Sequence, residues 1–149
     1  MKTVKIQYAG ATIEICAFLA DTWPHKMNPD QWPTFCGAGG GIGDKLVPDE
    51  ICAVSVRHVC FDHDMGFAVG PDTREAFHSH NKRFYRNLLS VIVASDLQGK
   101  ELVAATNACA GYFLAVESPL GWINFSPCGE DHEANPAVKE KLLRLQGVE

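Results

Sequence analysis

The segment Cys60-Phe61-Asp62-His63-Asp64 follows a glycine-rich run, Phe35-Cys36-Gly37-Ala38-Gly39-Gly40-Gly41-Ile42-Gly43, and together they carry the strongest signal in the chain. Apolar residues around the first segment recur at helical spacing, and His63 fills a gap in their stripe. Adjacent residues on a helix point about 100° apart, so His63 faces the interior while Asp64 faces another way. The sequence therefore predicts a helix that presents a base and a negative charge, with a flexible loop before it.

Two helices are expected to form the centre of the fold. Pro48-Asp49-Glu50 has the chemistry of a helix start, which predicts a first helix over residues 49–67. Its stripe contains Cys52, Val56, Val59, Cys60, His63 and Phe67. A second helix is expected over residues 72–95. Its stripe contains Phe77, Phe84, Leu88 and Val91, with Asn81 between the first two, so Asn81 also faces inward.

Other elements are expected on both sides of this pair. Period-two spacing on either side of Ala9-Gly10 predicts a β-hairpin within residues 1–20. Prolines and glycines make residues 21–49 a long loop. Helical spacing predicts a third helix over residues 102–116, and residues 122–125 form at most a short strand or a covering loop. A closing helix is expected between Asn135-Pro136 and Gly147.

Length and composition restrict the class of protein. A chain of 149 residues with 46% hydrophobic residues predicts a single domain over residues 1–149, and the helices expected from the spacing make it mostly α. The net charge of −5 argues against binding to nucleic acid. Because no apolar run reaches the roughly 18 to 20 residues of a spanning helix and no signal peptide is visible, we expect a soluble protein, cytoplasmic or exported without a cleaved signal.

The predicted loop and helix are suited to metal-assisted ester hydrolysis. Calcium takes oxygen ligands, and the carbonyls of residues 35–39 with the carboxylate of Asp64 are suitable ones. A neutral His63 has one nitrogen free to take a proton from water if an acceptor holds the other N–H. Asn81 is the nearest plausible acceptor, and the N–H of Gly37 is a candidate donor to the oxyanion.

These residues resemble the calcium loop and active-site helix of the phospholipase A2 superfamily over residues 35–85. The resemblance implies calcium as cofactor, a phospholipid or other lipid ester as substrate, and transient contact with a membrane surface. It assigns the catalytic base to His63, its catalytic partner to Asn81, and the family's loop-to-helix disulfide to Cys36 and Cys60. It places the calcium ligands at Phe35, Gly37, Gly39 and Asp64.

The chain departs from this family where the second helix holds the histidine. The family usually has an aspartate at the position that matches Asn81. A carboxamide oxygen accepts the imidazole N–H, but it does not stabilise imidazolium as a carboxylate does, and its NH2 group needs a partner of its own. A second hypothesis is therefore a non-catalytic binding or interaction protein with the same scaffold.

Several residues have competing interpretations. A zinc site could draw on imidazole and carboxylate ligands, although their spacing fits no familiar zinc pattern. Residues 37–43 also fit the G-x-x-x-G-x-G loop of short-chain dehydrogenases, but no buried strand precedes them and no Tyr-x-x-x-Lys is present. The four basic residues of the second helix are expected on an exposed face. The zinc candidates are His58, Asp62, His78 and His80, and the basic residues are Arg74, Lys82, Arg83 and Arg86.

Overall fold

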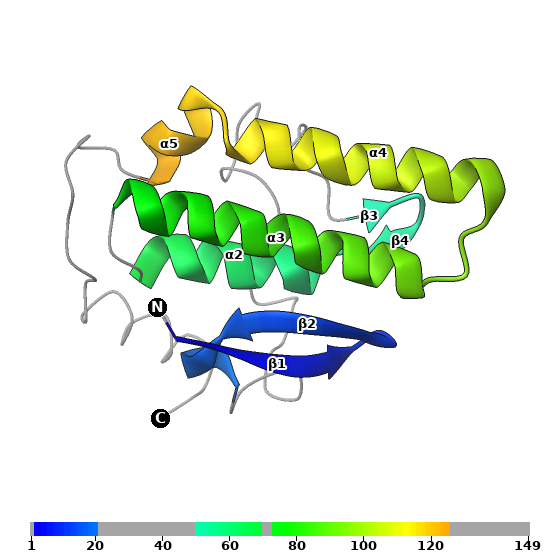
Figure 1. Ribbon diagram of the computed structural model, residues 1–149, viewed down its shortest axis with the longest axis horizontal. Coiled ribbons are helices and arrows are strands. Elements are labelled where there is room, and N and C mark those ends of the chain that lie inside the picture. Colours follow the sequence, from blue (N-terminus) through cyan, green and yellow to red (C-terminus); the bar gives the residue numbers. More distant parts are fainter. Residues whose placement is uncertain (1, 21–49, 70–72, 126–149) are drawn as a thin grey trace.

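The computed structural model describes residues 2–20, 50–69 and 73–125, and this part of the chain is mostly helical with a small N-terminal β-hairpin (Figure 1). The predicted fold class is confirmed. In chain order the elements are β1 (Thr3–Tyr8), β2 (Ala11–Cys16), the 3-10 turn η1 (Ala17–Leu19), β3 (Glu50–Ile51), β4 (Val54–Ser55), α2 (Arg57–Val69), α3 (Arg74–Ala94), α4 (Gly99–Val116) and α5 (Pro119–Phe125).

The N-terminal hairpin forms as its alternation predicts. Strands β1 and β2 pair antiparallel with Tyr8 opposite Ala11, so Ala9 and Gly10 form a two-residue turn. Both have positive φ, 49° and 77°, which is the conformation of the type I′ turn that matches strand twist. Ile13 and Ile15 on one face of β2 are buried in the core.

The first central helix begins at Arg57 rather than near residue 49, which corrects the prediction. The preceding residues form a small hairpin in which Ile51 pairs with Val54. Cys52 and Ala53 join its strands with φ of 49° and 65°, a left-handed conformation that an α-helix excludes. Cys52 is therefore exposed and is not part of the helical stripe. Apolar spacing alone did not separate this short hairpin from a first helical turn.

Helices α3 and α4 lie where helical spacing predicts them. Thr73 caps α3, since its Oγ1 accepts a hydrogen bond from Ala76 N–H at 3.1 Å. The prediction for residues 122–125 is wrong, because they belong to α5. Ser118 and Pro119 start that helix: the hydroxyl of Ser118 accepts from Gly121 N–H at 3.3 Å, and a proline at the first helical position needs no N–H partner.

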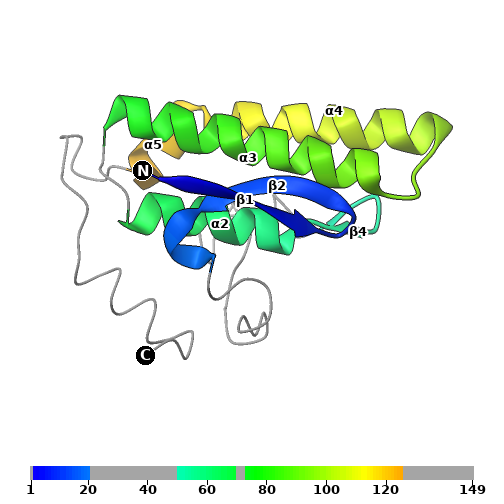
Figure 2. The same ribbon diagram turned by 60° about the horizontal axis from the view of Figure 1, so that its bottom comes forward.

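Helix α3 lies at the centre of the described structure. It packs against α2, α4 and β2, and the two views in Figures 1 and 2 show α4 along one side of it and the hairpin on another. One cluster of buried side chains joins these elements. None of the described helices is both long enough and apolar enough to cross a membrane. The predicted loop over residues 21–49 and the closing helix lie outside the described residues.

Candidate active site

His63 and Asn81 meet between α2 and α3, as their inward positions predict. His63 Nε2 lies 2.7 Å from Asn81 Oδ1, and Asn81 Nδ2 donates to the carbonyl oxygen of Val116 at 3.2 Å. Asn81 is fully buried and His63 is 6% exposed. The carboxamide thus has a partner at each end, which is what a buried amide requires.

The hydrogen bonds around Asn81 fix the protonation of the His63 ring. Because the NH2 group of Asn81 must face the Val116 carbonyl, its oxygen faces the imidazole and can only accept. The proton of a neutral His63 is therefore on Nε2. Nδ1 carries the lone pair, so the ring is set up to act as a base at Nδ1.

Asp64 lies on the Nδ1 side of the ring. Its Oδ1 is 3.7 Å from His63 Nδ1, longer than a hydrogen bond, so this carboxylate accepts no hydrogen bond from Nδ1. The Asp64 side chain is 42% exposed, whereas that of His63 is 7% exposed. The helix therefore presents a buried imidazole beside a carboxylate that reaches the surface.

Aromatic rings hold the imidazole in place. The ring centroids of Phe67 and Phe84 lie 4.2 Å and 4.6 Å from that of His63. Phe67 comes from the next turn of α2 and Phe84 from α3, so both helices contribute to the wall. With the Asn81 hydrogen bond, these contacts restrict rotation of the ring and keep Nδ1 aimed in one direction.

A buried ionic network, which the sequence interpretation missed, lies beside this site. Asp62 is 1% exposed and accepts from Cys16 N–H at 2.7 Å and from Arg83 Nε at 2.9 Å. Arg83 is 3% exposed, and its Nη2 also contacts Cys16 Sγ at 3.2 Å and His80 Nδ1 at 3.0 Å. The network ties β2, α2 and α3 together. The prediction of an exposed Arg83 is therefore wrong.

His80 is neutral in this network. Burial, followed by the nearby positive charges of Arg83 and of His63 when protonated, lowers the pKa of His80 to about 3. Its Nδ1 can then accept from Arg83. Gly66 on α2 makes this close packing feasible, because a Cβ at that position would lie 2.6 Å from His80 Nδ1.

A second unanticipated contact fixes the hairpin to α3. Glu14 N–H donates to Asn87 Oδ1 at 2.9 Å, and Asn87 Nδ2 donates to the Glu14 carbonyl at 2.7 Å. The Asn87 amide thus pairs with the outer edge of β2 as a neighbouring strand would. His80, Arg83 and Asn87 recur at helical spacing beside the apolar stripe of α3. That spacing was the sequence signal that α3 buries a wider face than the apolar stripe alone.

The zinc alternative conflicts with the geometry of its four candidates. No three or more His, Cys, Asp or Glu side chains in the described ranges are grouped to hold a metal ion. The candidates contact different groups instead. His58 Nδ1 lies 2.6 Å from Tyr8 OH, His78 Nδ1 lies 2.6 Å from Glu117 Oε2, and Asp62 and His80 contact Arg83.

The remaining exposed basic residues are arranged as expected. The guanidinium of Arg74 lies 3.6 Å from the ring centroid of Trp122, and the rings of Trp122 and Phe77 meet in a T-shaped contact. Arg86 is exposed and forms a 3.7 Å ion pair with Glu14. Packing rather than phosphate binding therefore accounts for the contacts of Arg74 and Trp122.

Of the four predicted calcium ligands, the structure describes Asp64 alone. Phe35, Gly37 and Gly39 lie outside the described residues, as does the N–H of Gly37 that was expected to face an oxyanion. Cys60 is disulfide-bonded, whereas Cys16, Cys52 and Cys109 are free thiols. The predicted partner of Cys60 is Cys36, which also lies outside the described residues, so the Cys36–Cys60 pairing stays a prediction.

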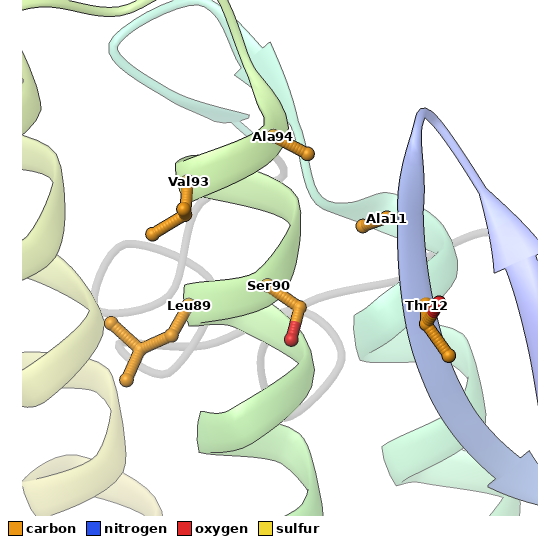
Figure 3. Close-up of a pocket in the computed structure, with 6 residues that line it drawn as sticks. All are labelled: Ala11, Thr12, Leu89, Ser90, Val93 and Ala94. Carbon is orange, nitrogen blue, oxygen red and sulfur yellow. The ribbon is translucent and has the colours of Figure 1, made fainter.

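A shallow hollow of about 440 Å³ lies between β2 and the end of α3, apart from the residues around His63 (Figure 3). It is uncharged, and none of the candidate site residues lines it. Its lining residues are Ala11, Thr12, Leu89, Ser90, Val93 and Ala94.

Comparison with protein-family models, curated proteins and solved structures finds no match to this chain.

Proposed function

We propose that this chain is a calcium-dependent esterase that hydrolyses phospholipids, or another lipid ester, with His63 as the base that activates water. The observation that carries the proposal is the fixed ring of His63. Asn81 accepts the Nε2 proton while its own NH2 group is held by Val116, which leaves Nδ1 unprotonated beside Asp64. A base held in one tautomer and one direction is what proton abstraction from water requires.

In this proposal each residue around His63 has a separate role in activating water. Nδ1 of His63 takes the proton from an attacking water, and Asn81 keeps the opposite side of the ring in place. The imidazolium formed in this step is positive, and the Asp64 carboxylate lies 3.7 Å away, where it stabilises that charge. The aromatic wall of Phe67 and Phe84 shields the ring from bulk water.

The donor chemistry of Asp64 fits a calcium ion. The carboxylate is a hard oxygen ligand on the accessible side of α2. Phe35, Gly37 and Gly39 would add backbone carbonyl oxygens. Bound there, the ion would supply positive charge for the oxygen on which negative charge develops.

The test is hydrolysis of phospholipid vesicles by the purified protein during a calcium titration. We expect calcium-dependent release of fatty acid, loss of at least about 100-fold in rate in His63→Ala, and loss of calcium dependence in Asp64→Ala. Asp96→Ala, which changes an exposed carboxylate between α3 and α4, is the control and should keep the activity. Equal activity in the unmodified chain, His63→Ala and Asp64→Ala contradicts the proposal.

A second candidate function is binding without turnover, and the neutral Asn81 favours it. A carboxamide cannot balance the imidazolium charge as a carboxylate would. Comparison with Asn81→Asp separates the two candidates. An unmodified chain that hydrolyses lipid at enzyme-like rates excludes the binding protein. If only Asn81→Asp is active, the scaffold is competent and the unmodified chain does not turn over lipid, as the second candidate requires.

The dinucleotide-binding alternative gains no support from the described part of the chain. Both sheets there are two-stranded and antiparallel. The dehydrogenase fold instead requires a parallel sheet with the glycine loop between a strand and a helix.

A further inference from the structure

The corner where α4 meets α5, residues 116–122, lies beside the start of α3 (Figure 1). Three side chains of α3, spaced by four and three residues along one face of the helix, contact this corner. The contacts are Arg74 with Trp122, His78 with Glu117, and Asn81 with Val116. The third contact reaches the candidate site, because Asn81 also holds the His63 ring.

The carbonyl oxygen of Val116 fixes the orientation of the Asn81 amide. Val116 is the last residue of α4, so no N–H of that helix satisfies its carbonyl, which accepts from Asn81 Nδ2 at 3.2 Å instead. If this oxygen were displaced, the two orientations of the amide would differ little in energy. In the flipped orientation the NH2 group donates to Nε2 of His63, and the proton of the neutral ring is then on Nδ1. The position of the carbonyl therefore decides which nitrogen of His63 is the base.

Gly121 leaves room for this carbonyl. A Cβ added at Gly121 would overlap the carbonyl oxygen of Val116 and lie 2.7 Å from its carbonyl carbon, so a side chain there would force the carbonyl or α5 to move. The backbone of Gly121 does not itself require glycine, because the described glycines with positive φ are Gly10 and Gly99. The close approach to Val116 accounts for a glycine at this position.

The pair of His78 and Glu117 holds the residue next to Val116. The Nδ1–H of His78, one turn before Asn81 on α3, donates to Glu117 Oε2 at 2.6 Å. The Glu117 side chain is 19% exposed, and its Oε1 is buried with no hydrogen-bond partner in the described part of the chain. A mostly buried carboxylate is costly without a polar partner, so His78 keeps Glu117 in the corner. We call Gly121 together with the His78–Glu117 pair the corner lock.

We propose that the corner lock positions His63: it holds the Val116 carbonyl against Asn81 and thereby keeps the His63 proton on Nε2. This rests on the proposed function, in which Nδ1 takes the proton from water. Residues of the corner lock do not touch the imidazole and act through the two residues between. Their loss should lower the fraction of chains in the reactive tautomer, which lowers kcat and leaves KM unchanged.

Long-range nitrogen–proton NMR of the folded full-length chain reads the tautomer of His63. In Gly121→Ala we expect the population protonated on Nδ1 to rise about 5-fold or more, the factor that corresponds to one ordinary hydrogen bond. Gly111→Ala is the matched control, because it makes the same change on α4 where a Cβ meets no atom within 4 Å. It should leave the tautomer unchanged. Circular dichroism checks that each variant is folded.

The acidic member of the corner lock gives a second test, which decides the proposal if Gly121→Ala does not fold. Glu117→Ala should shift the tautomer in the same direction. Glu117→Gln should restore the unmodified tautomer, because its carboxamide oxygen still accepts from His78. Glu101→Ala, which removes an exposed carboxylate from the first turn of α4, is the control and should have no effect.

A merely structural role for these residues predicts a different result. The variants would melt at lower temperature, but the folded chains would keep the unmodified tautomer, and this outcome overturns the proposal. An equal tautomer shift in Gly121→Ala and Gly111→Ala also overturns it.

Lipid hydrolysis separates the corner lock from the proposed function. If the unmodified chain hydrolyses lipid and Gly121→Ala keeps its tautomer, the corner lock is overturned and the proposed function stands. If the unmodified chain hydrolyses no lipid, the proposed function fails, and a tautomer shift in Gly121→Ala and Glu117→Ala alone still supports the corner lock.

Discussion

Replacing Asp62 by asparagine should destabilise the protein far more than the small change in size suggests. The two Asp62 oxygens accept from Cys16 N–H and Arg83 Nε, at 2.7 Å and 2.9 Å. In Asp62→Asn one of these oxygens becomes an NH2 group that faces another donor, and the Arg83 guanidinium remains buried without a counter-charge. Breaking one partner of a buried ion pair costs about 3–5 kcal/mol.

Urea denaturation followed by circular dichroism measures this cost. With an m-value of about 2 kcal/mol per molar urea, a loss of about 4 kcal/mol lowers the midpoint by roughly 2 M. Arg86→Gln is the matched control, because Arg86 lies on α3 one turn after Arg83. Arg86 forms a 3.7 Å ion pair with Glu14, and the two side chains are 61% and 32% exposed. Loss of this ion pair should cost at most about 1 kcal/mol.

The double variant Asp62→Leu with Arg83→Met should recover part of the lost stability, because it leaves no buried charge uncompensated. The reasoning is refuted if Asp62→Asn and Arg86→Gln shift the urea midpoint by similar amounts. It is also refuted if the double variant is less stable than Asp62→Asn.

Three further perturbations test other parts of the structure. Burial and Arg83 lower the pKa of His80 from 6.5 to about 3, so below pH 6.5 the unfolded chain binds a proton that the folded chain does not. The free energy of unfolding should therefore fall by up to about 1.4 kcal/mol per pH unit down to pH 3. Urea titrations at several pH values measure this slope, and His80→Gln should remove it. Gly66→Ala would place a Cβ 2.6 Å from His80 Nδ1 and should cost about 1–3 kcal/mol, whereas Gly111→Ala, with open space around its Cβ, should be neutral or stabilising in thermal unfolding. Ala9→Asn should stabilise the N-terminal turn by up to about 1 kcal/mol, since asparagine tolerates a φ of 49° better than alanine; an unchanged or lower melting temperature would count against the turn assignment.

The elements that follow from sequence are those in which local pattern and tertiary packing agree. The N-terminal hairpin has both alternation and a turn glycine, and α3 has both a capping threonine and a long apolar stripe. The prediction that a helix begins near residue 49 was wrong, because the apolar residues 51–54 fit both a helical turn and a short hairpin. Ile51 and Val54 pair only because Cys52 and Ala53 adopt positive φ, which composition does not reveal.

The candidate site was predictable in part for the same reason. His63 and Asn81 each fill a gap in an apolar stripe, so their meeting follows once two helices pack face to face. The network of Asp62, Arg83 and Cys16 did not follow, because charged residues next to a stripe are normally solvated. Helix α3 buries a wider face than one stripe, since it packs against α2, α4 and β2 at once.

The protonation of the His63 ring tests the central claim most directly. Long-range nitrogen–proton NMR of the folded protein, above the pH at which the ring is protonated, distinguishes the two neutral tautomers. We expect the proton on Nε2, with Nδ1 unprotonated, and a shift toward a mixture of tautomers in Asn81→Ala. A proton on Nδ1 in the unmodified chain would contradict the account, because Asn81 would then not hold the ring and the base facing Asp64 would be blocked.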